Sequence, residues 1–123
     1  MIKTLVLVLV AALLGGSGHV LLSKGMKTIG DMTEAPTHRI AGMTVRVVSN
    51  PWVLLGVALQ ASFFAMYLML LSRADVSKIL PMMAIDYVVV VFLAQLLLAE
   101  SVTPVRWIGV ALITAGVVMV WRT

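Results

Sequence analysis

Residues 52–71 read WVLLGVALQASFFAMYLMLL, a continuous apolar run in which only Gln60, Ser62 and Tyr67 carry polar groups. A helix rises about 1.5 Å per residue, so a run of this length crosses the roughly 30 Å of hydrocarbon in a bilayer. Lipid offers no hydrogen-bond partner to the backbone, whereas a helix satisfies its own backbone groups. The stretch therefore predicts a membrane-spanning helix and sets the fold class.

Three further apolar runs accompany this one, at about residues 4–22, 76–99 and 104–121. The whole chain has 123 residues, of which 62% are hydrophobic and 11% are charged. Soluble domains are about one quarter charged, so this chain has too little polar surface to cover itself in water. The composition excludes a soluble enzyme, a nucleic-acid-binding domain and a disordered tail.

Together the four runs predict an all-α membrane protein, with residues 1–123 forming a single transmembrane domain. No run alternates with the period of two that a membrane β-barrel requires. The connections at residues 72–75 and 100–103 are short, which favours antiparallel neighbours in an up-down bundle.

The connection between the first two runs is longer and contains a predicted helix of its own, at residues 37–49. Pro36 suits the start of that helix. At helical spacing, most of its aliphatic side chains gather on the side opposite Arg39 and Arg46. We expect this amphipathic helix to lie in the membrane interface. The two arginines either anchor it to lipid headgroups or present guanidinium groups to a substrate phosphate.

Basic residues divide almost evenly between the two sides of the predicted bundle. Because four spans put both termini on one side, that side carries Lys3, Arg73, Lys78 and Arg122. The opposite side carries Lys24, Lys27, Arg39, Arg46 and Arg106. The positive-inside rule therefore gives no orientation. Either the chain inserts both ways and forms an antiparallel homodimer, or the basic residues of the first loop bind an anionic ligand and override the bias.

Asp86 lies near the middle of the third predicted span. A carboxylate at that depth costs about 2.5–3.5 kcal/mol on insertion scales, so it is a candidate substrate-binding residue. Tyr87 and Gln95 are candidates to line a polar cavity with it. The structural alternative is a hydrogen bond from Asp86 to a neighbouring helix through Gln60, Ser62 or Tyr87.

Polar residues within the first span and at the ends of the spans are further candidates. His19, within the first span, is either a substrate contact or a donor between helices. Lys24 and Lys27 either extend their ammonium groups to the interface or hold a substrate phosphate. Glu100 and Arg106 lie on the same side of the membrane as these lysines and are candidates for an ion pair or a gate.

Small residues predict where helices approach closely. Gly109 and Gly116 lie two turns apart on the fourth span, either as a dimer contact or as packing within one chain. The chain contains no cysteine, and no group of His, Asp and Glu has metal-ligand spacing. No glycine-rich phosphate loop or nucleophile elbow occurs. We therefore expect no metal, no cofactor, no enzymatic activity and no nucleic-acid partner.

Two stretches give the chain a resemblance to the drug/metabolite transporter superfamily in its four-helix form. The first is residues 15–26, GGSGHVLLSKGM, where small residues are followed by a lysine. The second begins with SKILP at residues 77–81, passes Asp86 and Tyr87, and reaches ESVTP at residues 100–104. It then continues as the glycine-containing RWIGVALITAGV at residues 106–117. This pattern is similar to EamA-type repeats.

The resemblance also separates two branches of the superfamily. Small multidrug resistance exporters carry a glutamate in the first helix, and the first span here contains no acidic residue. Aminoarabinose-phosphoundecaprenol flippase subunits also lack that glutamate, and their third helix similarly carries a proline, a polar residue where Asp86 stands, and a glutamate matching Glu100. Asp86 departs from that branch, which usually has an amide there.

The resemblance implies a transporter of the bacterial inner membrane that moves a polyprenyl-phosphate-linked sugar or related anionic lipid. It would act as a homodimer, or as a heterodimer with a similar four-helix subunit, while the lipid chains stay in the bilayer. One alternative is a proton-coupled exporter of small cations that uses Asp86. The other is a membrane subunit that does not transport and stabilises a partner.

Overall fold

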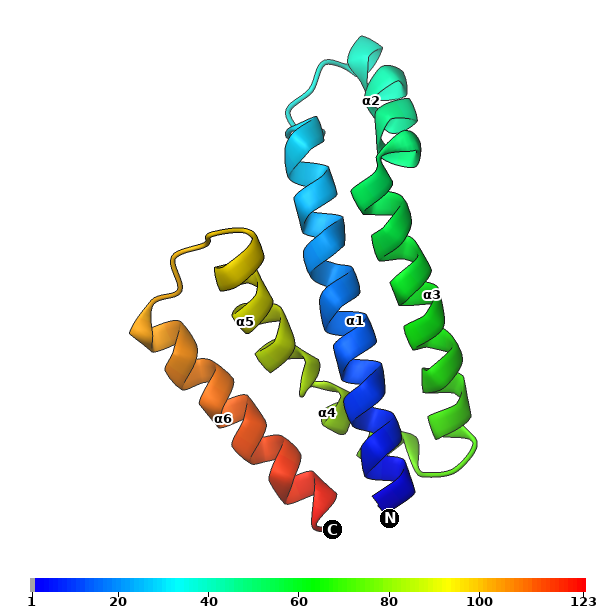
Figure 1. The fold of residues 1–123 in the computed structure, drawn as a ribbon, viewed down its shortest axis with the longest axis vertical. Helices are drawn as coiled ribbons and strands as arrows, with labels where there is room; N and C mark the ends of the chain where they lie inside the picture. The colour runs from blue at the N-terminus through cyan, green and yellow to red at the C-terminus, as the bar shows by residue number, and fades with distance from the viewer. Residues whose placement is uncertain (1) are drawn as a thin grey trace.

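The computed structural model describes residues 2–123, and every regular element within that range is a helix (Figure 1). The elements in chain order are α1 (Ile2–Ile29), α2 (Thr37–Ser49), α3 (Pro51–Leu71), α4 (Val76–Met83), α5 (Asp86–Leu97) and α6 (Pro104–Trp121). The prediction of an all-α protein is confirmed.

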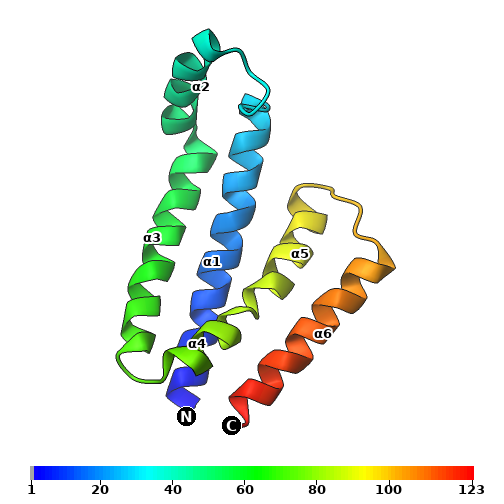
Figure 2. The same ribbon diagram turned by 180° about the vertical axis from the view of Figure 1, so that it is seen from behind.

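Four stretches are long and apolar enough to cross a membrane: α1, α3, the α4–α5 pair over residues 76–97, and α6. They correspond to the four runs that the sequence predicts. Both chain termini lie at the same end of these helices, and α2 lies beyond the opposite end of α1 and α3 (Figures 1 and 2). In both views α1 and α3 run side by side in opposite directions.

The first helix is longer than the apolar run from which it was predicted. It continues without a break through residues 15–18 and ends at Ile29 rather than at about residue 22. Hydropathy indicates only the part of a helix that lies in lipid. It does not detect a more polar helical extension such as residues 23–29. The signal for the true end is Gly30, which adopts a positive φ of 102° as a helix-terminating residue and donates its amide to the Met26 carbonyl.

The third span is two helices instead of one continuous segment at 76–99. Between α4 and α5, the amides of Ala84 and Ile85 donate to carbonyls three residues back, as do those of Tyr87 and Val88. Such bonds tighten the chain relative to an α-helix and separate two helical pieces. The span then ends at Leu97, and Ala99 takes a positive φ of 54°.

The loop helix α2 has the bounds that the sequence predicts, residues 37–49. None of its residues is buried. Asn50 links it directly to α3, because the Asn50 side chain accepts hydrogen bonds from the amides of Trp52 and Val53. The same side chain donates to Thr28 Oγ1 at 2.9 Å, which ties this junction to the end of α1. Its placement in a membrane interface stays a prediction.

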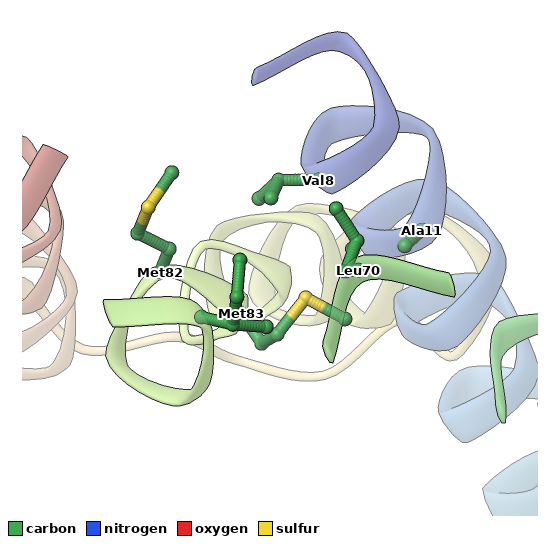
Figure 3. Close-up of a cluster of buried hydrophobic side chains, with 6 residues drawn as sticks. Val8, Ala11, Leu70, Met82 and Met83 are labelled. Carbon is green, nitrogen blue, oxygen red and sulfur yellow. The ribbon is translucent and has the colours of Figure 1, made fainter. Parts of the chain in front are cut away.

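A cluster of buried side chains joins three helices near the end that carries the termini. Val8 and Ala11 come from α1, Leu70 from α3, and Met82 and Met83 from α4 (Figure 3). Ile79 completes the cluster. This core holds the turn between the second and third spans against the start of α1.

Higher along α1, glycines replace large side chains and let the backbones of α1 and α3 come together. A Cβ added to Gly56 would lie 2.8 Å from Leu22 Cγ and 3.0 Å from the Gly18 carbonyl oxygen. Beside this contact, Gln60 Nε2 donates a 2.9 Å hydrogen bond to the Gly15 carbonyl. Lipid tails are as apolar as leucine, so close packing and such hydrogen bonds supply the attraction between the helices.

We predict that Gly56→Ala lowers the free energy of unfolding by about 1–3 kcal/mol, because the new methyl group meets backbone that cannot move aside. Gly42→Ala is the control, since a Cβ at Gly42 in α2 has no atom within 4 Å. It should leave stability unchanged or raise it by up to about 1 kcal/mol. Unfolding in mixed micelles, followed by far-ultraviolet circular dichroism, measures both variants. Equal stability of the two proteins would contradict the packing argument.

Candidate functional site

Asp86 is the buried charged residue in the described part of the chain, and its nearest charged partner is a histidine. It is the first residue of α5, directly after the break in the third span. Asp86 Oδ2 lies 3.8 Å from His19 Nε2 of α1, with the two side chains 11% and 52% exposed. When His19 is protonated, the two groups form an ion pair at the middle of the membrane-spanning helices.

Glycine in α1 lets the two helices approach at this point. A Cβ added to Gly16 would lie 2.7 Å from Val89 Cγ1 and 3.2 Å from the Asp86 carbonyl oxygen. His19 follows Gly16 by about one turn, so the close approach brings its ring to the Asp86 carboxylate. Asp86 also sits at the N-terminus of α5, where the helix dipole favours a negative charge.

Two of the three hydrogen-bond partners that the sequence offers for Asp86 are engaged elsewhere. Gln60 donates to the Gly15 carbonyl, and Ser62 donates to the Ala58 carbonyl of its own helix. The pairing of Asp86 with His19 joins two residues that the sequence nominates separately. Sequence could not pair them, since the rotation of α1 against α5 decides which side chains meet.

Tyr87 and Gln95 do not join Asp86 within this chain. Tyr87 is 52% exposed, and Gln95 is also exposed. Gln95 follows Asp86 by two and a half turns, which places it on the opposite side of α5. Within residues 2–123, the polar site at this depth therefore consists of His19 and Asp86.

Three basic side chains make separate contacts at the end of α1. Lys24 Nζ lies 4.2 Å from the centre of the Trp52 ring, a cation–π contact with the start of α3. Lys27 Nζ donates to Glu100 Oε1 at 2.7 Å, so α1 is joined to the segment after α5. Arg46 donates from α2 to the Thr28 carbonyl at 3.4 Å.

The partner of Glu100 is thus Lys27, and Arg106 makes no ion pair in the described residues. Ala99 precedes Glu100 in a left-handed conformation, and the Glu100 amide donates to the Ala94 carbonyl. This reversal turns the chain back after α5. Arg106 lies exposed in the first turn of α6, where its amide donates to Thr103 Oγ1.

A cavity of about 480 Å³ lies between the end of α1 and the loop helix α2. Its lining residues are Ile29, His38, Arg39, Gly42, Met43 and Arg46. Arg39 and Arg46 therefore share one cavity, as a common anion site requires. His38 adds a third nitrogen-bearing side chain that sequence reasoning did not select, although it neighbours Arg39.

The two glycines proposed as dimer contacts face open space among the described residues. A Cβ added to Gly109 or Gly116 would have nothing within 4 Å. Val110 is the buried residue of α6, and large side chains elsewhere on the helix are exposed. Their role as a dimer contact stays a prediction.

Curated proteins are similar in sequence to this chain over more than half of its length. The probable 4-amino-4-deoxy-L-arabinose-phosphoundecaprenol flippase subunit ArnE of Pseudomonas savastanoi pv. phaseolicola is 31% identical over 71 residues, which is 58% of this chain and 62% of the relative. The protein of the same name from Pseudomonas aeruginosa is 34% identical over 82 residues, 67% of this chain and 70% of the relative. The one from Proteus mirabilis is 29% identical over 68 residues, 55% and 60% of the two chains.

The chain spans about three fifths of the length of the first curated relatives it matches. No solved structure matches it. The family comparison covers far more, because the EamA-like transporter family matches residues 2–122. Together with the four spanning-length helices, these similarities identify a multi-pass protein of the bacterial inner membrane. The chain belongs to the EamA-like transporter family.

Proposed function

We propose that the chain is one subunit of a dimeric translocase that moves a polyprenyl-phosphate-linked amino sugar across the inner membrane. The family and the names of the relatives support a transporter for this class of lipid. The observation that carries the proposal is the pairing of buried Asp86 with His19 at the break in the third span. Ionisable groups and broken helices at mid-membrane depth mark transport sites.

The headgroup of such a lipid carries both charges that this pair can bind. Its sugar ammonium replaces His19 beside the Asp86 carboxylate. A protonated His19 then faces the phosphate that links sugar and lipid. The cargo thereby exchanges one ion pair for two, so no charge is left alone in the hydrocarbon.

The cavity with Arg39 and Arg46 is the second binding site on the proposed path. Paired guanidinium forks suit a phosphate, since each can donate two parallel hydrogen bonds. Ile29 in that cavity follows His19 by roughly three turns, or about 15 Å along α1. A single headgroup cannot touch both places, so the arginines capture the lipid at the surface and His19–Asp86 binds it during passage.

Lys24 and Lys27 lie on α1 between the two binding sites, the His19–Asp86 pair and the cavity with Arg39 and Arg46. A phosphate that passes them competes with Glu100 for the Lys27 ammonium, which makes the Lys27–Glu100 pair the proposed gate. The exposed Arg106 is the cation that can receive Glu100 when that pair opens. Lys24 holds the passing phosphate from its position over Trp52.

The second subunit completes the site in this proposal. Tyr87 and Gln95 are exposed on α5, so they meet the headgroup only if another chain packs there. Gly109 and Gly116 give α6 a flat face for a helix of that chain. The partner is a second copy or a similar four-helix subunit.

We predict that Asp86→Asn lowers the rate at which reconstituted protein moves the aminoarabinose-linked phosphoundecaprenol by at least about tenfold, since the ammonium loses its counter-charge. Asp86→Glu should retain a larger share of the rate. Glu34→Gln is the matched control, because it removes a carboxylate from the exposed loop. The measurement is chemical labelling of the amino sugar on the outer leaflet of proteoliposomes.

Full transport by an Asp86→Ala protein would end the assigned role. Binding of a lipophilic cation that depends on pH and disappears in Asp86→Asn would instead favour a proton-coupled exporter of small cations. If variants of Asp86 change only the recovery of a co-purifying partner, the chain is a stabilising subunit without transport activity of its own.

We predict that the double substitution Arg39→Ala and Arg46→Ala raises the Kd for undecaprenyl phosphate by about tenfold or more at low salt. The difference should shrink at high salt, because exposed charges are screened. Arg73→Ala, at the opposite end of the helices, is the control and should bind as the unchanged chain does. Similar Kd values for all three proteins would show that the arginines only anchor α2 to the membrane.

We predict that Gly116→Leu weakens self-association or partner recovery, because leucine fills the flat face of α6. Gly42→Leu is the control, since it enlarges a glycine that also has no neighbour within 4 Å but lies in α2. Chemical cross-linking in native membranes measures the dimer fraction. An unchanged fraction for Gly116→Leu would place the subunit contact on another helix.

A further inference from the structure

A dry groove runs along α1 on the side that faces α6. It consists of two adjoining cavities of about 260 and 390 Å³, which share Leu9 and Ile85 as lining residues. We call it the Leu9 groove. Val118 and Trp121 bound its lower part, and Thr114 of α6 bounds its upper part.

The residues that line the Leu9 groove are apolar apart from Thr114 and the indole N–H of Trp121. The Thr114 hydroxyl donates to the Val110 carbonyl of its own helix at 2.9 Å, so it offers no free donor to the groove. A cavity of this kind excludes water and accepts hydrocarbon. Its length from Thr114 to Trp121 is two helical turns, or about 10 Å.

The upper end of the groove lies at the charged pair. Ile85, which lines both cavities, directly precedes Asp86 in the chain. Val89 also lines the upper cavity, and it is the residue that packs against Gly16 one turn before His19. The Leu9 groove therefore meets a pair of opposite charges at mid-membrane depth.

We propose that the Leu9 groove binds the isoprene units next to the phosphate of a polyprenyl phosphate. This inference rests on the proposed function and replaces the expectation that the whole lipid chain stays in the bilayer. The polyprenyl chain starts at the phosphate beside His19 and runs between α1 and α6 toward Trp121. The remainder of the polyprenyl chain extends into the surrounding lipid.

The position of the polar end selects this occupant over a membrane phospholipid. A phospholipid keeps its headgroup at the bilayer surface, so only the far end of its acyl chain would reach Asp86. A lipid caught during translocation has its headgroup at mid-depth and its chain starting there. A helix of a second copy, about 10 Å across, is too wide to enter cavities of this size.

The test compares two neighbouring substitutions in the purified full chain. Leu9 and Val10 are 45% and 41% exposed, and only Leu9 lines the groove. Both variants also carry Arg39→Ala and Arg46→Ala, so that binding at the surface arginines does not contribute to the Kd. In that background Leu9→Trp should raise the Kd for undecaprenyl phosphate by at least about tenfold by filling the groove, while Val10→Trp should change it by less than about twofold. Native mass spectrometry from micelles measures both.

A second pair of variants tests the opposite wall and guards against a folding defect. Val118→Trp fills the groove from α6, and Leu112→Trp adds the same ring to an exposed position of that helix outside the groove. Val118→Trp should reproduce the loss and Leu112→Trp should not. Farnesyl phosphate, a short prenyl phosphate, should show the same ranking of variants because only the first units lie in the groove.

Three outcomes would overturn the proposal. Equal binding of undecaprenyl phosphate by Leu9→Trp and Val10→Trp removes the groove from the site. If phosphatidic acid binds as tightly as undecaprenyl phosphate does, and Leu9→Trp weakens both equally, the groove accepts any lipid chain. A disulfide between Leu9→Cys in one chain and Leu112→Cys in another, in a protein with no native cysteine, shows that a second copy fills the groove.

The result also separates this proposal from the proposed function. If Leu9→Trp retains full affinity while the unchanged chain still moves the lipid-linked sugar, the groove assignment fails and the transporter stands. If the unchanged chain neither binds undecaprenyl phosphate nor moves the sugar lipid, both proposals fail.

Discussion

The close approach of the α1 backbone to its neighbours is the constraint on which the rest of the structure depends. In lipid, helices gain little from burying apolar side chains, because the bilayer already solvates them. Contact at Gly18 and Gly56 brings α1 against α3, and contact at Gly16 brings it against α5. The Gln60 side chain adds a hydrogen bond to this packing without placing a charge in the membrane. A single added methyl at these points would meet backbone or a packed side chain.

Because of this constraint, α1 packs tightly against α3 and α5, whereas α6 packs against little of the chain. The side chains of His19 and Lys27 contact α5 and the segment after it because α1 is fixed there. By contrast, α6 buries little of its surface against the rest of the chain and meets mainly α4. The groove between α1 and α6 can therefore widen without breaking the glycine contacts. A helix that is held at one end is suited to admit a lipid from the side.

Sequence reasoning succeeded where one helix alone decides the outcome. Hydropathy located the four spans, and Pro36 with the pattern of residues 37–49 located the loop helix. It failed where local backbone chemistry decides. Gly30 ends α1 later than the hydropathy predicts, and hydrogen bonds to carbonyls three residues back divide the third span. It also nominated Asp86 and His19 without pairing them, because the rotation of one helix against another has no signature in a single sequence.

The charge pair gives the proposed site a reason to be selective. In hydrocarbon, an ion pair is tolerable and a lone charge is costly, so the resting site keeps Asp86 beside His19. A cargo with an ammonium and a phosphate can take both positions and leave each charge with a partner. A lipid with a phosphate alone binds at His19 but more weakly, because it leaves the carboxylate unpaired, and a simple cation does the reverse. A site built from one acid and one base therefore favours a zwitterionic headgroup, and the dry groove beside it favours one that is attached to a hydrocarbon chain.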